Sequence, residues 1–243
     1  MCKLKSAIIL KDRIFMPDYD SHSKMLEELG ITDDYFNASK VFVRAELAPE
    51  NGDVFSDIDG WKLKVDQDIT PEWFDEKDCA ERMRKAVKEW AKTHIFVGQN
   101  DLKISHGENI FIKDCKNVDI YDKATVKDIY GDATVESICE NATVETICEN
   151  ATVQNIYGNA TVQNIYGKAT VQNIYGKATV KNICGKATVK NICDNAMVLS
   201  SPYTKWNNST SMVIDDNATF KDCYSKTIYQ AGGWEFVKVT RGK

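Results

Sequence analysis

Residues 151–177 read ATVQNIYGN-ATVQNIYGK-ATVQNIYGK, three consecutive copies of nine residues that differ only at the last position. The same period continues on both sides, with alanine at every ninth residue from Ala124 to Ala196 and isoleucine at every ninth residue from Ile120 to Ile192. A nine-residue unit is too short to bury its own apolar side chains, so successive copies must stack on one another. The stretch therefore predicts an elongated repeat architecture.

The residue types of the repeat indicate strands and turns. Val, Ile, Thr and Tyr favour strands, whereas Gly-Lys, Gly-Asn and Glu-Asn doublets favour turns. A period of nine matches neither the heptad nor the eleven-residue repeat of coiled coils. Because side chains alternate along a strand, Ala and Val are expected inside and Thr outside. We expect a corner near the Asn of each QNI triplet, followed by an inward Ile and an outward Tyr or Cys, so that each copy forms two short strands.

The fold class expected from this pattern is mainly β, a parallel β-solenoid with about two nonapeptides per coil. Three copies per coil would give a wider, triangular section, but the small Ala and Val side chains favour the narrower coil of two. Nine or ten copies then make about five coils, a rod roughly 24 Å long at ~4.8 Å per coil. Each fully buried Val or Ile contributes about 1.5–3 kcal/mol, so the stack can support its own fold.

Asparagine recurs at one repeat position, at Asn155, Asn164, Asn173, Asn182 and Asn191. Asn tolerates left-handed backbone, which fits a corner. Stacked amides can also hydrogen-bond to one another along the axis. We interpret this ladder as structural and not catalytic.

The segments on either side of the repeat are expected to form separate parts. Residues 1–100 are assigned to a small α+β domain for capping and recognition, which covers the first coil because an open solenoid end would template aggregation. Residues 101–200 are assigned to the solenoid. Residues 201–243 are assigned to a loop, one degenerate repeat at Ala218 and a C-terminal capping strand.

Within the N-terminal domain, SAIILKDRIFMP, KVFVRAEL and WKLKVDQD have the composition of strands. SHSKMLEELG is typical of a short helix ended by Gly30. The segment TPEWFDEKDCAERMRKAVKEWAKTHI predicts a longer helix, with Thr70 as N-cap and Pro71 in the first turn.

The composition is that of a soluble globular protein, with 43% hydrophobic residues, 28% charged residues and a formal net charge of -5. This mild charge does not indicate nucleic acid or an anionic membrane as a partner. No run approaches the roughly 20 apolar residues that span a bilayer, and no early segment resembles a signal peptide. None of the eight cysteines lies in a C-x-x-C pair, so free thiols and a cytoplasmic location are expected.

One candidate for chemistry is His22, which lies near Asp18 and Asp20 in the sequence. These residues could hold a metal or act in acid–base catalysis. A helix N-terminus capped by Asp20 or Ser21 explains them more simply. No nucleophile elbow, phosphate-binding loop or dinucleotide fingerprint is present.

A second candidate is the acidic stretch with Asp53, Asp57, Asp59, Asp66 and Asp68. It resembles the start of a calcium loop but lacks the bidentate glutamate. A hairpin with an acidic turn is preferred. No catalytic, cofactor-binding or metal residue is therefore assigned, no cofactor is expected, and catalysis is left open with a preference against it.

Charge is divided along the repeat. The first part of the repeat, residues 119–149, holds eight acids. The later part, residues 168–190, holds five lysines and no acid. A neutral belt of Gln and Asn lies between the two parts. The acids are Asp119, Asp122, Asp128, Asp132, Glu136, Glu140, Glu145 and Glu149, and the lysines are Lys168, Lys177, Lys181, Lys186 and Lys190. The division indicates either a solubilising surface or an oriented docking surface.

The segments LKDRIFMPDYDSHSKMLEELGI, FVRAEL and WKLKVDQDITPEWF resemble a set of uncharacterised proteins of gut bacteria and their phages. These share such a head, followed by varying numbers of nine-residue A-T-V-like copies, and the resemblance covers nearly the whole chain. It implies a phage or prophage setting, with the host cytoplasm as location, but no activity. The rod also resembles pentapeptide-repeat solenoids, some of which imitate DNA. Its period differs from theirs, and its basic half departs from a DNA mimic.

These observations predict a non-enzymatic protein-interaction module that binds an unidentified protein, such as a host defence component, with the solenoid as a rigid scaffold. One alternative is a metal-dependent or hydrolytic head carried on a solenoid, with His22, Asp57 and Asp59 as the residues to test. Another is a self-assembling structural rod driven by its acidic and basic ends, in which case the protein would be an oligomer.

Overall fold

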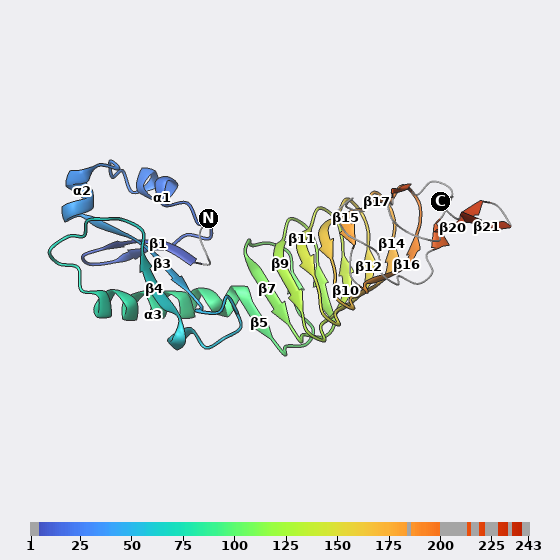
Figure 1. Ribbon diagram of the computed structural model, residues 1–243, viewed down its shortest axis with the longest axis horizontal. Coiled ribbons are helices and arrows are strands. Elements are labelled where there is room, and N and C mark those ends of the chain that lie inside the picture. The colour runs from blue at the N-terminus through green and yellow to red at the C-terminus, as the bar shows by residue number, and fades with distance from the viewer. Residues whose placement is uncertain are drawn as a thin grey trace. The chain divides into compact units, whose positions relative to one another are not determined.

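The computed structural model describes residues 5–183, 186–199, 213–214, 219–221, 228–232 and 235–239. The chain divides into two compact units, Met1–Ile95 and Phe96–Lys243, which we name the head and the solenoid. Figure 1 labels their elements. The loop expected over residues 201–212 lies outside the described residues.

The head is built on an antiparallel sheet of four strands in the order β2-β1-β3-β4. Its elements are β1 (Lys5–Leu10), β2 (Ile14–Phe15), α1 (His22–Glu28), α2 (Tyr35–Lys40), β3 (Phe42–Ala48), the 3-10 helix η1 (Ile58–Gly60), β4 (Lys62–Val65) and α3 (Glu76–His94). Figure 1 shows α1 and α2 on one side of this sheet and α3 on the other. All six residues of β1 are buried, because helices cover both faces of the sheet. The predicted α+β class of the head is confirmed.

Two helix starts show how local capping works in the head. Ser21 caps α1 by accepting a hydrogen bond from the backbone N–H of Lys24, as one of the predicted capping residues. The longer helix starts later than predicted, because Asp75 and not Thr70 is its N-cap, with the Asp78 N–H at 2.8 Å. Pro71 accordingly lies in a turn before α3, where its carbonyl accepts from the N–H of Phe74. Asp is among the best N-cap residues, and the acidic first turn complements the helix dipole.

The strands of the solenoid alternate between two sheets. They are β5 (Ile95–Val97), β6 (Lys103–Ile104), β7 (Ile110–Lys113), β8 (Val118–Ile120), β9 (Thr125–Tyr130), β10 (Thr134–Ile138), β11 (Thr143–Ile147), β12 (Thr152–Ile156), β13 (Thr161–Ile165), β14 (Thr170–Ile174), β15 (Thr179–Ile183), β16 (Thr188–Ile192), β17 (Met197–Leu199), β18 (Val213–Ile214), β19 (Thr219–Lys221), β20 (Ile228–Gly232) and β21 (Glu235–Val239). Even-numbered strands, with β21 added, form one sheet and odd-numbered strands from β5 to β19 form the other.

Parallel pairing gives the number of repeats per coil. Val153 pairs with Val135 in the preceding coil and with Val171 in the next, a step of 18 residues each way. Two nine-residue copies therefore make one coil, which confirms the predicted parallel β-solenoid.

Each regular copy forms one strand and one turn, so the prediction of two short strands per copy is wrong. Strands β12, β13 and β14 all span the five residues TVQNI, with Val and Ile buried and Thr, Gln and Asn half-buried. Gln and Asn are consecutive and both point outward, which breaks the alternation of inward and outward side chains. The Gln position is also missing from the residue pairs of the parallel ladder. The expected corner is thus only a local interruption within a continuous strand.

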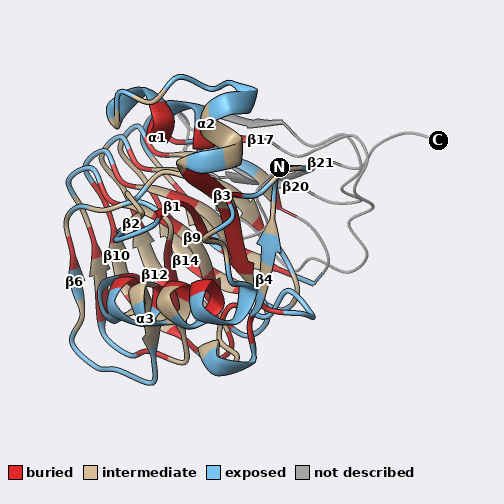
Figure 2. Cartoon of the chain, turned by 90° about the vertical axis from the view of Figure 1, so that its left-hand side faces the viewer, coloured by how far each residue is buried: buried red, intermediate tan, exposed pale blue. Residues whose placement is uncertain are grey.

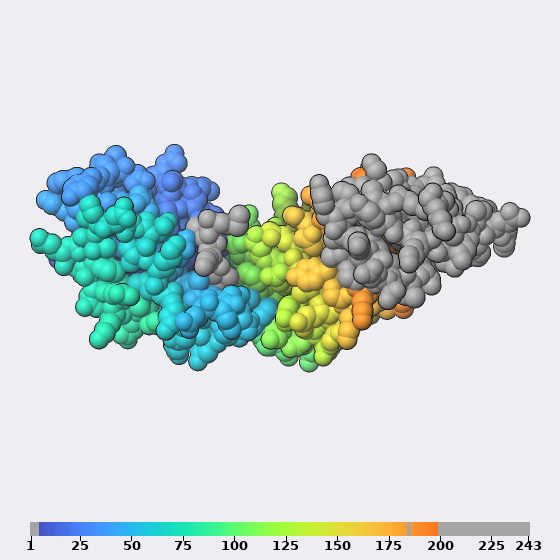
Figure 3. All heavy atoms as spheres, in the orientation of Figure 1, coloured from blue at the N-terminus to red at the C-terminus, as the bar shows by residue number. Residues whose placement is uncertain are grey.

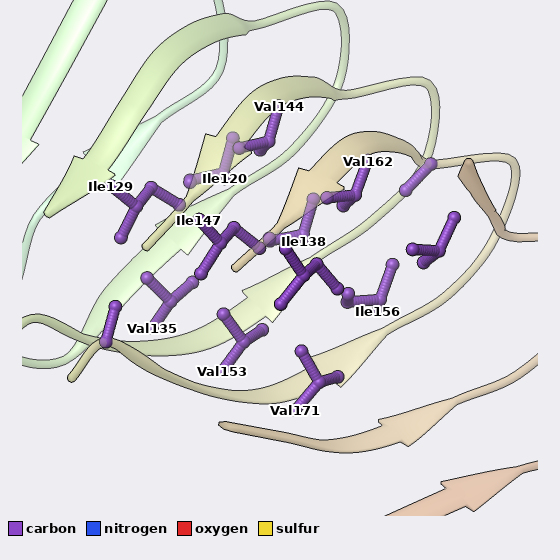
Figure 4. Packing of buried hydrophobic residues seen from close by; sticks show 14 of the residues in the cluster. Ile120, Ile129, Val135, Ile138, Val144, Ile147, Val153, Ile156, Val162 and Val171 are labelled. Atoms are coloured by element: carbon purple, nitrogen blue, oxygen red, sulfur yellow. The ribbon is translucent and has the colours of Figure 1, made fainter. Parts of the chain in front are cut away.

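The core of the solenoid consists of one Ala, one Val and one Ile from each regular copy. Figure 4 shows these side chains from both sheets pointing toward one another, among them Val144, Ile147 and Ile156. Each of these three is fully buried. In the space-filling view, the visible coils from green to orange form a continuous packed surface (Figure 3). The predicted inward positions are confirmed.

The turn lies at the Tyr or Cys and the two residues that follow it. Its second residue has left-handed backbone, with φ of 69° at Gly158 and 58° at Glu140. The asparagines do not occupy this conformation, so their predicted place at a corner is wrong. They do form the predicted amide ladder within the strands, where Asn173 donates to Asn155 at 3.0 Å and Asn191 donates to Asn173 at 2.8 Å.

Strands continue the coils beyond the regular copies. β17 pairs in parallel with β19, which places Phe220 in register with Val198. β21 pairs antiparallel with β20. No helix in the described part of the chain is long and apolar enough to cross a membrane.

Candidate functional site

The outward side chains of the solenoid form columns, because equivalent residues recur every 18 positions. One column runs through Lys127, Glu145, Gln163 and Lys181 on the sheet of odd-numbered strands. This column therefore changes from charged to neutral to basic along the chain.

Most acids of the first half form side-chain contacts with a neighbouring coil. Glu136 accepts from the Gln154 side chain at 2.8 Å, and Asp119 accepts from the Ser137 hydroxyl at 2.5 Å. Glu145 forms an ion pair with Lys127. Two further carboxylates accept hydrogen bonds between coils, Asp132 from Asn150 and Glu140 from the N–H of Asp122. These contacts use carboxylates that the sequence alone would leave free for a partner.

The lysines of the later half are different. Five lysines are exposed, and within the described residues none forms an ion pair; they are Lys168, Lys177, Lys181, Lys186 and Lys190. We name them the lysine surface. Lys168 and Lys186 occupy equivalent turns of neighbouring coils. The nearby acid Asp194 accepts a hydrogen bond from the backbone N–H of Gly176. The lysine surface thus carries positive charge that no described side chain pairs in a salt bridge.

The Tyr and Cys position differs in exposure from copy to copy. Tyr166 is 42% exposed, in line with the predicted outward position, whereas Cys139 and Cys148 are buried, and burial raises the pKa of the Cys148 thiol to about 11. Tyr157 and Tyr175 stack with their ring centroids 5.0 Å apart. Because Cys139 takes the equivalent place in the coil before Tyr157, the stack does not extend into a longer aromatic platform. All cysteines whose side chains the structure describes are free thiols, as predicted.

Half-buried Asp128 gives a testable pH dependence. Burial raises the pKa of this carboxyl, and the hydroxyl of Thr146 opposes the shift by donating to it. A raised folded-state pKa means that the folded chain binds the proton more tightly, so stability falls as pH rises from the unfolded value through the folded one. Asp128→Asn should therefore be more stable than the parent at neutral pH, and the difference should vanish near pH 3. Chemical denaturation across this range measures it.

The control for this prediction is Thr146→Ala, which removes the opposing hydrogen bond. It should increase the pH dependence of stability that Asp128→Asn abolishes. Identical pH profiles for the parent and Asp128→Asn would contradict the burial effect.

The structure brings His22 together with one acid of the second candidate set, Asp66. His22 is buried, with Nε2 3.2 Å from the carbonyl of Ala45 and Nδ1 3.5 Å from Asp66. Asp57 accepts from the backbone N–H of Asp59, whose carboxylate pairs with Lys88 at 2.6 Å. In the described residues, no three His, Cys, Asp or Glu side chains lie close enough together to hold a metal ion.

The acidic stretch of the head lies in a hairpin connection. β3 and β4 pair antiparallel, and Asp53, Asp57 and Asp59 lie between them. This confirms the predicted acidic hairpin. The sequence suggested no partner for His94. In the structure its Nε2 lies 3.3 Å from a carboxylate oxygen of Asp18 and its Nδ1 lies 2.8 Å from the Trp90 carbonyl oxygen.

The head also contains a groove that sequence reasoning missed. It has a volume of about 790 Å³ and lies between β4 and α3, lined by Lys62 and Leu63 of the strand and by Lys77, Ala80 and Arg84 of the helix. The only signal in the sequence is the set of basic residues beside the apolar face of the predicted helix. Their position next to a strand edge depends on the tertiary fold.

Comparisons with protein-family models, with characterised proteins and with solved structures find no match for this chain. They identify no family, so the phage-related resemblance stays a prediction.

Proposed function

We propose that this chain is a non-enzymatic protein-interaction module whose solenoid is a rigid scaffold with a docking surface for an acidic protein. The observation that carries the proposal is the contrast between the two halves of the repeat. Carboxylates such as Glu136 and Asp132 are bonded between coils, whereas the lysine surface has no ion pair among the described residues. Charges without internal partners are those that steer association with an oppositely charged protein.

The rigidity that a scaffold needs is supported by the core and by the bonds between coils. Ala151, Val153 and Ile156 are fully buried, and each lies against the same residue type of the neighbouring coils. The Asn ladder adds side-chain hydrogen bonds along the axis. Outward residues can therefore vary without loss of the inward pattern, which suits a surface that evolves toward a partner.

The setting is part of the proposal. The resemblance of the head suggests a phage or prophage protein that binds a host component in the host cytoplasm. Free Cys79, Cys115, Cys139 and Cys148 fit a reducing compartment. The partner to seek first is accordingly an acidic protein of a bacterial host.

The test is charge reversal on the full chain. The variant Lys168→Glu/Lys186→Glu should lose a host protein that the parent retains on affinity purification, with an apparent Kd at least ~10-fold weaker once that partner is purified. Salt should weaken the parent complex, since the Debye length shrinks from about 10 Å at 0.1 M to about 3 Å at 1 M.

The matched control is Lys103→Glu/Lys123→Glu, which makes the same change of net charge at two exposed lysines outside the lysine surface. It should bind as the parent does. Equal loss in both variants, or retention of the partner in both, would contradict the proposal. Salt-sensitive self-association of the parent in light scattering, with no other protein bound, would favour the self-assembling rod instead.

A further inference from the structure

We infer that the groove between β4 and α3 binds an extended acidic peptide of a partner protein, which adds to the head sheet as a fifth strand beside β4. This inference deepens the proposed function, on which it rests, by assigning a second site and the chemistry of its ligand. Strand addition to an exposed sheet edge is a common mode of peptide recognition, in which the main chain supplies affinity and alternate side chains supply specificity.

The first observation is the free edge of β4. In the order β2-β1-β3-β4, the strand pairs with β3 on one side, and no other described strand pairs with it. The backbone N–H of Asp66 donates to the carbonyl of Arg44 at 2.9 Å. The next hydrogen-bonded pair in this register is Glu46 with Lys64. Because hydrogen-bonded pairs alternate in an antiparallel ladder, Leu63 and Val65 direct their N–H and C=O groups away from β3. These groups form the edge that an added strand would use.

The second observation is the position of α3 beside this edge. Leu63 lines the groove from the strand, and Lys77, Ala80 and Arg84 line it from one side of the helix. Figure 2 shows exposed residues along both β4 and α3. A strand bound here would place every second side chain against α3, where it meets the apolar Leu63 and Ala80 and the basic residues of the helix.

The third observation is charge. Among the groove residues, Lys88 pairs with Asp59, and Glu89 pairs with Lys92. Four cations line the groove without an ion pair to a described residue, against two such carboxylates. The cations are Lys62, Lys77, Arg84 and Lys85, and the carboxylates are Glu76 and Glu81. The groove therefore favours an acidic ligand, although the whole chain is acidic.

A second copy of this chain is a poorer occupant. Lys62 and Lys64 are both exposed on β4. Pairing of two β4 edges would bring these lysines close to one another, and like charges across a ladder are destabilising. Lysine on an edge strand is also a common means of preventing self-pairing. A partner strand with acids at alternate positions would not be repelled by these lysines.

The test uses the full chain and a fluorescein-labelled peptide of about eight residues, an ordinary strand length, that alternates glutamate and valine. Fluorescence anisotropy should show saturable binding, at least ~10-fold tighter than that of a matched lysine–valine peptide. Lys77→Glu/Lys85→Glu should weaken binding at least ~10-fold, whereas the control Lys103→Glu/Lys123→Glu should not. Hydrogen exchange on the unmodified chain should show peptide-dependent protection of the Leu63 and Val65 amides.

Several outcomes would overturn this inference: equal binding of both peptides, no saturable binding, no effect of the groove variant, or protection confined to other amides. Concentration-dependent protection of Leu63 and Val65 without peptide would assign the edge to a second copy of the chain. Failure of this inference can be told apart from failure of the proposed function. The proposed function is tested by partner retention that depends on Lys168 and Lys186, which do not line the groove.

Discussion

Replacement of Ile156 by alanine is expected to lower the free energy of unfolding by about 2–5 kcal/mol. Ile156 is fully buried in β12, with Ile138 before it and Ile174 after it in the same column. Removal of its side chain leaves a cavity between coils that cannot collapse, because the backbone spacing is held by the parallel ladders. Urea unfolding followed by circular dichroism measures the loss.

The matched control is Gln154→Ala on the same strand. Gln154 is half-buried and donates one hydrogen bond to Glu136 at 2.8 Å. Its removal should cost about 0.5–1.5 kcal/mol, the net value of one hydrogen bond. Similar losses in the two variants would contradict the assignment of Ile156 to the core and Gln154 to the surface.

Gly158→Ala is expected to destabilise the solenoid by more than about 2 kcal/mol, through two effects that add. Gly158 has a φ of 69°, and left-handed backbone costs a residue with a side chain roughly 1–2 kcal/mol. A Cβ at this position would also lie 2.8 Å from the backbone nitrogen of Glu140 in the coil before it. The two turns would have to move apart, and the ladder hydrogen bonds near them would lengthen. Thermal and urea unfolding both report this change.

Gly30→Ala separates the two effects. Gly30 has nearly the same φ of 65°, but a Cβ there meets nothing within 4 Å. This variant should therefore show the backbone cost alone, roughly 1–2 kcal/mol. If Gly158→Ala costs no more than Gly30→Ala, close approach between the turns does not contribute to stability.

The inward positions of the solenoid could be predicted because every copy repeats the same spacing. Val126 and Ile129 recur every nine residues, a spacing that places their side chains inside every coil of a stacked solenoid. The corner could not be placed in the same way. Asn164 tolerates a left-handed turn, but Gly158 and Gly167 tolerate it better, and the strand stays continuous through the asparagines.

The sequence also predicted the charges of the solenoid only in part. The sequence places acids before lysines along the repeat, and the structure bears this order out. Which charges remain free depends on neighbours that are 18 residues apart, as with Glu145 and Lys127 or Asp132 and Asn150. These pairs follow from the coil length, which a nine-residue period leaves open between two and three copies.

The sequence by itself determined that this chain stacks nine-residue copies with Ala, Val and Ile inside, because a strict period with small and β-branched residues has few other ways to bury them. It also determined the α+β class of the head, through local strand and helix patterns. Only the tertiary structure decided that β4 is an edge strand, that Lys77 and Arg84 lie beside that edge, and that the lysine surface has no ion pair within the described chain. Those features arise from contacts between residues distant in sequence, which local propensity and periodicity do not predict.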